Sequence, residues 1–169
     1  MLNLRSLVYI AEKALQRVSA LEWLAPLLMR LFVGYFFFET GWAKLHNLDA
    51  FAARFAQWGI PAPAFNAALS AYTECIGGAL TVAGLGMRFV SVPMIINMVV
   101  AIIKVKMKNV AGLNDFVELD EPLYALVFFW PLVSGAGYLS LDYLIRTMIF
   151  PASAIPANAE KSPAVSNAG

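Results

Sequence analysis

Four long apolar runs, each with few charged residues, dominate the chain. They cover about residues 24–45, 66–85, 89–105 and 122–141. A helix needs about 20 mostly apolar residues to cross a bilayer, and lipid offers no partner to an unpaired backbone. The alternation at every second residue that marks a membrane strand is absent from these runs. The pattern therefore predicts an all-α integral membrane protein built as a four-helix bundle.

The first 22 residues follow a different pattern. Apolar residues recur there at helical spacing: Leu4, Leu7, Val8, Ala11, Leu15 and Val18. Polar residues fall on another face: Arg5, Glu12, Gln16 and Ser19. This predicts an amphipathic helix lying on the membrane surface over residues 1–22. A cleaved signal peptide is the alternative, which Glu12 and Lys13 disfavour because they cut the apolar run short.

The rest of the chain divides at about residue 146. Residues 23–146 hold the four predicted spans and form one membrane domain. Residues 147–169 are predicted to be a disordered tail, because the segment from Pro151 onward is mostly Ala, Pro, Ser and Asn. Between the spans, residues 46–65 and 109–121 are expected as the outer loops.

Composition narrows the function. Hydrophobic residues make up 60% of the chain and charged residues only 14%, against about 25% in soluble domains. The net charge of +1 gives no electrostatic footprint for nucleic acid. A single Cys and a single His exclude an internal disulfide and paired-histidine haem ligation. No metal-ligand set, nucleophile constellation or phosphate-binding motif occurs, so we do not expect an enzyme that acts on its own.

The orientation in the membrane follows from Lys and Arg near the ends of the spans. An N-inside arrangement places six basic residues inside: Arg5, Lys13, Arg17, Arg88, Arg146 and Lys161. It places five outside: Lys44, Arg54, Lys104, Lys106 and Lys108. This difference is small, but the first span carries most weight and follows a basic segment. We therefore expect both termini in the cytoplasm.

Polar residues inside the predicted spans are the candidate site. Ionisable groups are costly in lipid and usually face a partner or a wet cavity. Glu39, Glu74 and Asn97 lie about six to eight residues from the outer ends of their spans, or roughly 9–13 Å deep. Lys44, His46 and Lys104 lie at the mouth of this layer. The six residues are candidates for ligand binding or proton exchange, although a protonated carboxyl pair that only holds helices together fits as well.

A second polar layer is expected near the inner surface. It contains Arg30 and Asp142, with Arg88 close by. We interpret these three residues as a structural charge pair rather than a site. Cys75 belongs to a pattern of small residues with Ala71, Ala79 and Ala83, which favours helix packing over thiol chemistry.

Four segments of the chain, taken in order, resemble the DoxX family of small four-helix membrane proteins. They are RLFVGYFFFETGWAKL, FAARFAQWGIPAP, ECIGGALTVAGLGMR and GAGYLSLD, within residues 22–146. The positions that match the family pattern are Arg30, Gly41, Lys44, Gly59, Pro61, Glu74, Gly77, Gly78, Arg88 and Asp142. Ala136 and Tyr138 depart from it, since the family often has Pro and a basic residue there.

The resemblance implies a role beside a redox system. The family is named from a subunit of a thiosulfate:quinone oxidoreductase, and its members look like bacterial inner-membrane partners of redox or thiol-stress systems. We therefore expect an accessory or anchor subunit in the lipid bilayer that handles quinone, with a soluble oxidoreductase or another membrane subunit as partner.

Two other functions stay open. Lys44, Lys104 and Lys106 could form the mouth of a small transporter for a polar solute or a metal, which with only four spans would need a homodimer. The surface helix and the small-residue packing face fit a scaffold or assembly factor that binds no ligand.

Overall fold

The computed structural model describes residues 5, 9, 12, 13, 15 and 19–149. Most of the predicted surface helix at 1–22, and the predicted tail beyond residue 149, lie outside the described residues. The described part of the chain is helical, with no strand. This agrees with the predicted all-α class.

The helices follow one another with short connections. They are α2 (Leu24–His46), α3 (Leu48–Gln57), α4 (Pro63–Ala83), α5 (Met87–Ala101), α6 (Leu113–Val117), α7 (Asp120–Ser134) and α8 (Leu141–Ile149). A π-helical turn at Ile102–Lys106 extends α5 and leads into a 3-10 turn at Met107–Asn109.

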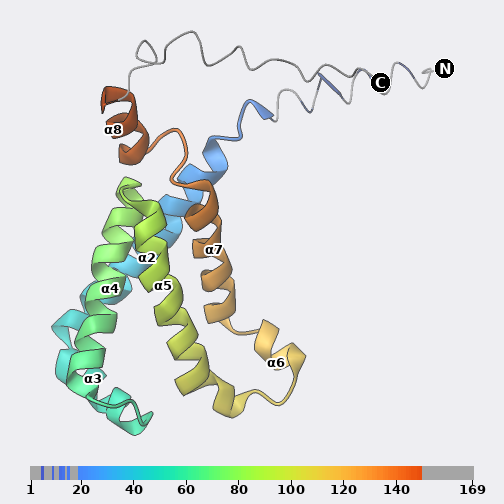
Figure 1. Cartoon of the computed structure of the whole chain (residues 1–169). Coiled ribbons are helices and arrows are strands. Elements are labelled where there is room, and N and C mark those ends of the chain that lie inside the picture. The colour runs from blue at the N-terminus through green and yellow to red at the C-terminus, as the bar shows by residue number, and fades with distance from the viewer. Residues whose placement is uncertain (1–4, 6–8, 10–11, 14, 16–18, 150–169) are drawn as a thin grey trace, which may run out of the picture.

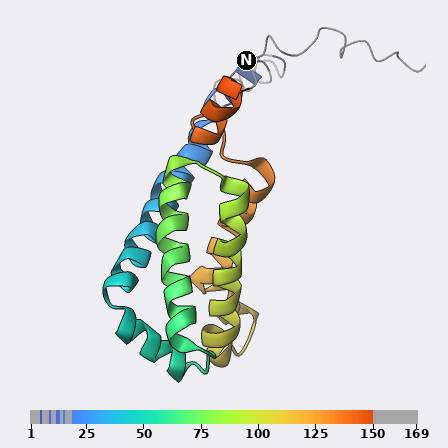
Figure 2. The ribbon, with the colours of Figure 1, turned by 60° about the vertical axis from the view of Figure 1, so that its left-hand side comes forward.

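The four longest helices lie side by side (Figures 1 and 2). Helix α4 packs on both α2 and α5, and α5 packs on α7. The short helices α3 and α6 lie at one end of this group, and α8 lies at the other (Figure 1). A cluster of buried apolar side chains joins α2, α5 and α7: Phe37, Val90, Met94, Met98 and Phe128.

Glycines allow α2 and α4 to touch through their backbones. A Cβ atom added to Gly41 would lie 2.3 Å from the backbone nitrogen of Cys75. One added to Gly78 would lie 2.3 Å from the backbone nitrogen of Phe38. Cys75 is buried at this contact, as the small-residue pattern predicts, whereas Ala79 is exposed. Close approach of this kind is typical of helix pairs in membranes.

Among the described residues, two helical segments are long and apolar enough to cross a bilayer by length and composition, Leu24–His46 and Met87–Lys106. Their exterior is covered with large apolar side chains, such as Phe32 at 73% exposure and Phe89 at 85%. A soluble protein rarely exposes so continuous an apolar surface. In a bilayer such a surface lies against acyl chains or against another membrane-embedded chain.

The fourth apolar run is shorter as a helix than expected. We predicted a span over about 122–141, but α7 ends at Ser134. Gly135 and Gly137 follow with φ of 82° and 83°, a left-handed backbone that cannot continue a right-handed helix. The chain then turns at this end of the bundle and begins α8 at Leu141.

The expected outer loop at 46–65 also contains a helix. Leu48, Phe51 and Phe55 recur at helical spacing and pack with Ile60 and Ala67 in a separate apolar cluster. This amphipathic pattern drives α3 to fold against the start of α4. The result is a cap of aromatic side chains over one end of the bundle.

Candidate binding site

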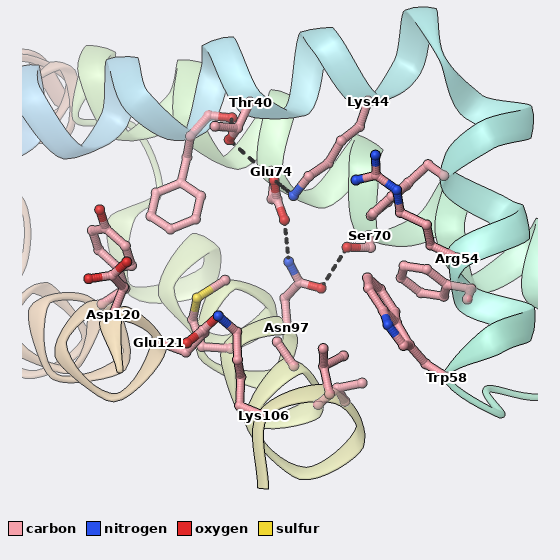
Figure 3. Close-up of a pocket in the computed structure, with 18 of the residues that line it drawn as sticks. Thr40, Lys44, Arg54, Trp58, Ser70, Glu74, Asn97, Lys106, Asp120 and Glu121 are labelled. Carbon is pink, nitrogen blue, oxygen red and sulfur yellow. Dashed lines mark hydrogen bonds and ion pairs between the residues drawn. The ribbon is translucent and has the colours of Figure 1, made fainter. Parts of the chain in front are cut away.

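A carboxylate from α4 lies at the centre of the polar contacts within the bundle. The Glu74 side chain is only 4% exposed. Its Oε2 atom forms an ion pair with Nζ of Lys44 and accepts a 3.2 Å hydrogen bond from Oγ1 of Thr40. Both partners lie on α2, four residues apart, and therefore on one face of that helix. The close contact of α2 with α4 brings them to Glu74 (Figure 3).

The other oxygen of this carboxylate is bound from α5. Nδ2 of Asn97 donates a 2.9 Å hydrogen bond to Glu74 Oε1. Oδ1 of Asn97 in turn accepts a 2.8 Å hydrogen bond from Oγ of Ser70, one turn before Glu74 on α4. Three helices thus meet in one polar cluster, which we call the Glu74 network: Thr40, Lys44, Ser70, Glu74 and Asn97 (Figure 3).

The Glu74 network forms one wall of a cavity of about 480 Å³, the central cavity. Much of the remaining wall is aromatic and comes from α2, α3, the residue that follows α3, and α7: Phe36, Phe37, Phe51, Phe55, Trp58 and Tyr124. Charged side chains also line the cavity: Arg54, Lys106, Asp120 and Glu121. The volume lies within the roughly 300–1,000 Å³ that small-molecule sites occupy.

This arrangement suits a flat ligand with polar edges. Aromatic side chains offer faces for stacking, and Nζ of Lys44 lies 5.1 Å from the centroid of the Phe51 ring. A lysine ammonium carries three donors, and in the described structure only Glu74 accepts one of them. The Lys44 side chain is 31% exposed and so remains accessible from the cavity.

Of the six predicted site residues, the structure brings three together: Lys44, Glu74 and Asn97. Glu39 is exposed and does not line the cavity. It lies two residues before the buried Gly41, or about 200° around the helix at 3.6 residues per turn. The expected common layer rested on depth alone, and the packing of α2 on α4 turns Glu39 away.

The other two candidates lie outside the network. His46 is exposed, with its Nδ1 atom 2.9 Å from the carbonyl oxygen of Trp42 and its ring 4.6 Å from the Trp42 ring. Lys104 is exposed on the π-helical turn. On the same turn, Lys106 forms an ion pair of 3.1 Å with Glu121 at the edge of the cavity.

Among the described residues, Arg30 and Asp142, the expected inner charge pair, form no direct ion pair, although the Asp142 carboxylate lies near enough to act on the Arg30 charge. Arg30 is buried and donates to the carbonyl oxygen of Leu139. Asp142 instead accepts hydrogen bonds from the backbone nitrogens at the start of α5, 2.7 Å from Gly86 and 3.2 Å from Met87. Exposed backbone N–H groups at a helix start attract a carboxylate in this way. Arg88 donates to the carbonyl oxygen of Val133 at 3.3 Å.

Sequence reasoning missed several residues of the site. Thr40 precedes Lys44 by four residues, and Ser70 precedes Glu74 by four, so helical spacing places each pair on one face. This spacing could have predicted that Thr40 and Ser70 belong to the site. The aromatic side chains of α3 were missed because their segment was expected as a loop.

The fold and the buried network define a helical integral membrane protein with a polar site inside its helix bundle. By sequence, the chain belongs to the DoxX family, whose profile matches residues 25–107. The matched range runs from the second residue of α2 through α5 and includes all five residues of the Glu74 network. The family resemblance of the sequence is therefore confirmed.

Two relatives show how far the similarity extends. A Bacillus subtilis protein named "Putative oxidoreductase CatD" is 33% identical, over 70% of this chain and 85% of the relative. A Mycobacterium tuberculosis protein named "Uncharacterized membrane protein Rv3486" is 37% identical, over 68% of this chain and 77% of the relative. No solved structure matches the chain.

Proposed function

We propose that this protein is a membrane subunit of a quinone-linked redox system, and that the central cavity binds the quinone headgroup. The observation that carries the proposal is a buried, fully hydrogen-bonded Glu74 beside an accessible lysine in an aromatic cavity. The membrane location brings the site to the phase where quinones dissolve. The name of the Bacillus relative adds support for redox work.

The chemistry of a quinone matches the donors and walls of the cavity. A quinone ring is flat and stacks on aromatic faces. Its two carbonyl oxygens accept hydrogen bonds, and Lys44 supplies N–H donors at the polar wall. Asn97 donates to Glu74 and so holds the carboxylate in place beside the ligand.

Proton exchange gives the Glu74–Lys44 pair a function beyond binding. Reduction of a quinone takes up two electrons and two protons and yields the quinol. In this proposal the electrons come from a partner oxidoreductase, soluble or in the membrane. The ammonium of Lys44 donates one proton to a reduced oxygen, regains a proton from the aqueous side of the cavity, and delivers the second proton to the ligand in the same way.

The proposed topology has four spans, α2, α4, α5 and α7, in a bacterial inner membrane with both termini in the cytoplasm. Helix α7 has 15 residues, about 22 Å at 1.5 Å per residue, which is short for a span. The amphipathic α8 follows it and would lie at the cytoplasmic interface. The central cavity then opens toward the outer side, at the end with α3 and α6.

Quinone retention tests the proposal. The protein is purified in mild detergent, and bound quinone is extracted and quantified per chain by mass spectrometry. We expect close to one quinone per chain in the wild type and at least tenfold less in Glu74→Gln. Glu118→Gln is the matched control, because Glu118 is exposed and does not line the cavity. Equal quinone content in wild type and Glu74→Gln would refute the assignment of the site.

Loss of quinone from a misfolded variant is distinguished by a second readout. The Glu74→Gln protein must elute as the same monodisperse peak, with the same helical content, as the wild type. The same preparation is examined for co-purifying proteins. A stoichiometric partner without any quinone would instead support the scaffold function.

A further inference from the structure

One face of α2 is exposed along the whole helix in the part of the chain that the structure describes. Its side chains recur at alternating spacings of three and four residues, and all are exposed. We call this face the α2 stripe: Ala25, Leu28, Phe32, Tyr35, Glu39, Trp42 and His46. Such a spacing places the seven residues in one line, as in the a and d positions of a heptad. The residues on the opposite face, including Gly34 and Gly41, pack against α4.

Glu39 lies within the span and on the exposed line. It is seven residues before the end of α2 at His46, or about 10 Å inside the helix end at 1.5 Å per residue. Among the residues that the structure describes, none forms a hydrogen bond or ion pair with the Glu39 side chain. A carboxyl group at this depth is costly when it faces lipid, and such groups normally have a protein partner.

The stripe carries donors that match this acceptor. Tyr35 lies one turn before Glu39 and Trp42 nearly one turn after it. The Tyr35 side chain is 60% exposed and that of Trp42 is 53% exposed. A phenol O–H and an indole N–H are both hydrogen-bond donors. In the described chain neither of these donors has an acceptor, so the face holds an acceptor and two donors that lack partners.

We propose that the α2 stripe is the interface of a homodimer, in which Glu39 of each copy accepts hydrogen bonds from Tyr35 and Trp42 of the second copy. Two copies inserted in the same orientation are related by a twofold axis along the membrane normal. Their stripes then run parallel, with equal residues at equal depth. Each Glu39 lies next to the donors one turn above and below it on the second copy.

The α2 stripe contains both the hydrogen-bond acceptor and the donors that a second copy of the stripe would need. It therefore suits a second copy of this chain better than a different protein that would offer a cation to Glu39. Apart from His46 at its end, the stripe is aromatic, aliphatic or acidic, and its donors and acceptor are balanced between two copies. The pairing also leaves the central cavity free. Thr40 and Lys44, which line that cavity, lie roughly 100–140° around α2 from Glu39. The dimer is therefore independent of the proposed quinone site.

Cysteine cross-linking in native membranes tests the interface. The buried Cys75 is first replaced by Ala, so that only introduced thiols react. Phe32→Cys and Leu28→Cys place a thiol on the stripe and are expected to give mostly disulfide-linked dimers on oxidation. Phe89→Cys on α5 is the matched control, since Phe89 is 85% exposed and lies outside the stripe. Equal cross-linking at Phe89→Cys and Phe32→Cys, or none at Phe32→Cys, would overturn the proposal.

A measurement of dimer affinity tests the role of Glu39. The monomer–dimer equilibrium is followed in mild detergent by native mass spectrometry over a dilution series. Glu39→Leu removes the acceptor and is expected to raise the dimer dissociation constant about 3- to 20-fold, the range for hydrogen bonds between membrane helices. Glu39→Gln keeps an acceptor oxygen and is expected to stay near wild type. A monomeric wild type, or a Glu39→Leu variant that dimerises as tightly as wild type, would contradict the inference.

Discussion

The side-chain amide of Asn97 donates a 2.9 Å hydrogen bond to Oε1 of Glu74 and so joins α5 to α4 in the interior of the bundle. Oε2 of the same carboxylate is bound from α2, by Lys44 and Thr40. The carboxylate therefore ties three helices together at one depth. The Glu74 network therefore holds the helices together as well as forming the wall of the cavity. Substitutions can test its contribution to stability separately from its proposed role in binding.

Removal of Asn97 is expected to destabilise the bundle. In Asn97→Ala, Glu74 Oε1 and the Ser70 hydroxyl both lose a partner in a largely buried place. An unsatisfied buried polar group costs about 1–3 kcal/mol. We expect a fall of that size in the free energy of unfolding, measured by SDS titration in mixed micelles and followed by circular dichroism.

The control for Asn97 is an exposed asparagine with no side-chain hydrogen bond among the described residues. Asn114 on α6 meets this condition. Asn114→Ala is expected to unfold like wild type. A loss in Asn97→Ala no larger than that in Asn114→Ala would show that the α4–α5 hydrogen bond does not stabilise the fold.

Substitution of Lys44 tests whether Glu74 needs its cation. Lys44→Met keeps an unbranched side chain that is one atom shorter and leaves the buried carboxylate without its ion-pair partner. Breaking a fully buried pair costs roughly 3–5 kcal/mol, and we expect less here because Lys44 is partly exposed. The double variant Lys44→Met/Glu74→Gln removes both charges and is expected to recover part of the stability. A double variant as unstable as the sum of the two single ones would rule out coupling between these residues.

The sequence predicted the helices well where composition alone determines them. The expected first span, 24–45, differs by one residue from α2 at Leu24–His46. The agreement is close because the thickness of the hydrocarbon core sets the length of an apolar span. The predicted end of the fourth span was wrong. The apolar sequence continues past Ser134, but the positive φ of Gly135 ends the helix there. Backbone conformation at glycine is not visible in a hydropathy pattern.

The sequence predicted the depth of the candidate site residues in the membrane, but not the face of the helix on which each one lies. Counting residues along each span placed Glu74 and Asn97 at one height, with Lys44 at the mouth of that layer. It gave Glu39 the same height, although Glu39 lies on the exposed face of α2. The rotation of a helix about its own axis depends on which neighbour it packs against, and that choice is made by the small residues at the α2–α4 contact. Once Gly41 is assigned to the contact, helical spacing places Glu39 on the far side.

The contact at Gly41 gives a direct prediction about packing. Gly41→Ala adds a Cβ 2.3 Å from the backbone nitrogen of Cys75, so α2 and α4 must move apart. Overpacking of this kind costs typically about 1–3 kcal/mol, and the shift also separates Lys44 from Glu74. We expect a lower unfolding midpoint in detergent and, if the proposed site is right, a weaker retention of quinone.

Gly112→Ala is the control for this glycine. An added Cβ there meets nothing within 4 Å, and the backbone of Gly112 is extended with φ of −159°. It is expected to unfold like the wild type. Equal midpoints for Gly41→Ala and wild type would mean that the two helices are not held in backbone contact.

Asp142 provides the last test, at the end of the bundle opposite the cavity. Its carboxylate accepts from the backbone nitrogens of Gly86 and Met87 and so caps the start of α5 from α8. Loss of a capping side chain costs about 0.5–2 kcal/mol, and we expect that loss for Asp142→Ala. Asp142→Asn retains one acceptor oxygen and is expected to fall between Asp142→Ala and wild type. Because the cap is distant from the Glu74 network, quinone retention is expected to be unchanged in folded Asp142→Asn. An Asp142→Ala variant as stable as wild type would show that the contact between α8 and α5 does not contribute to folding.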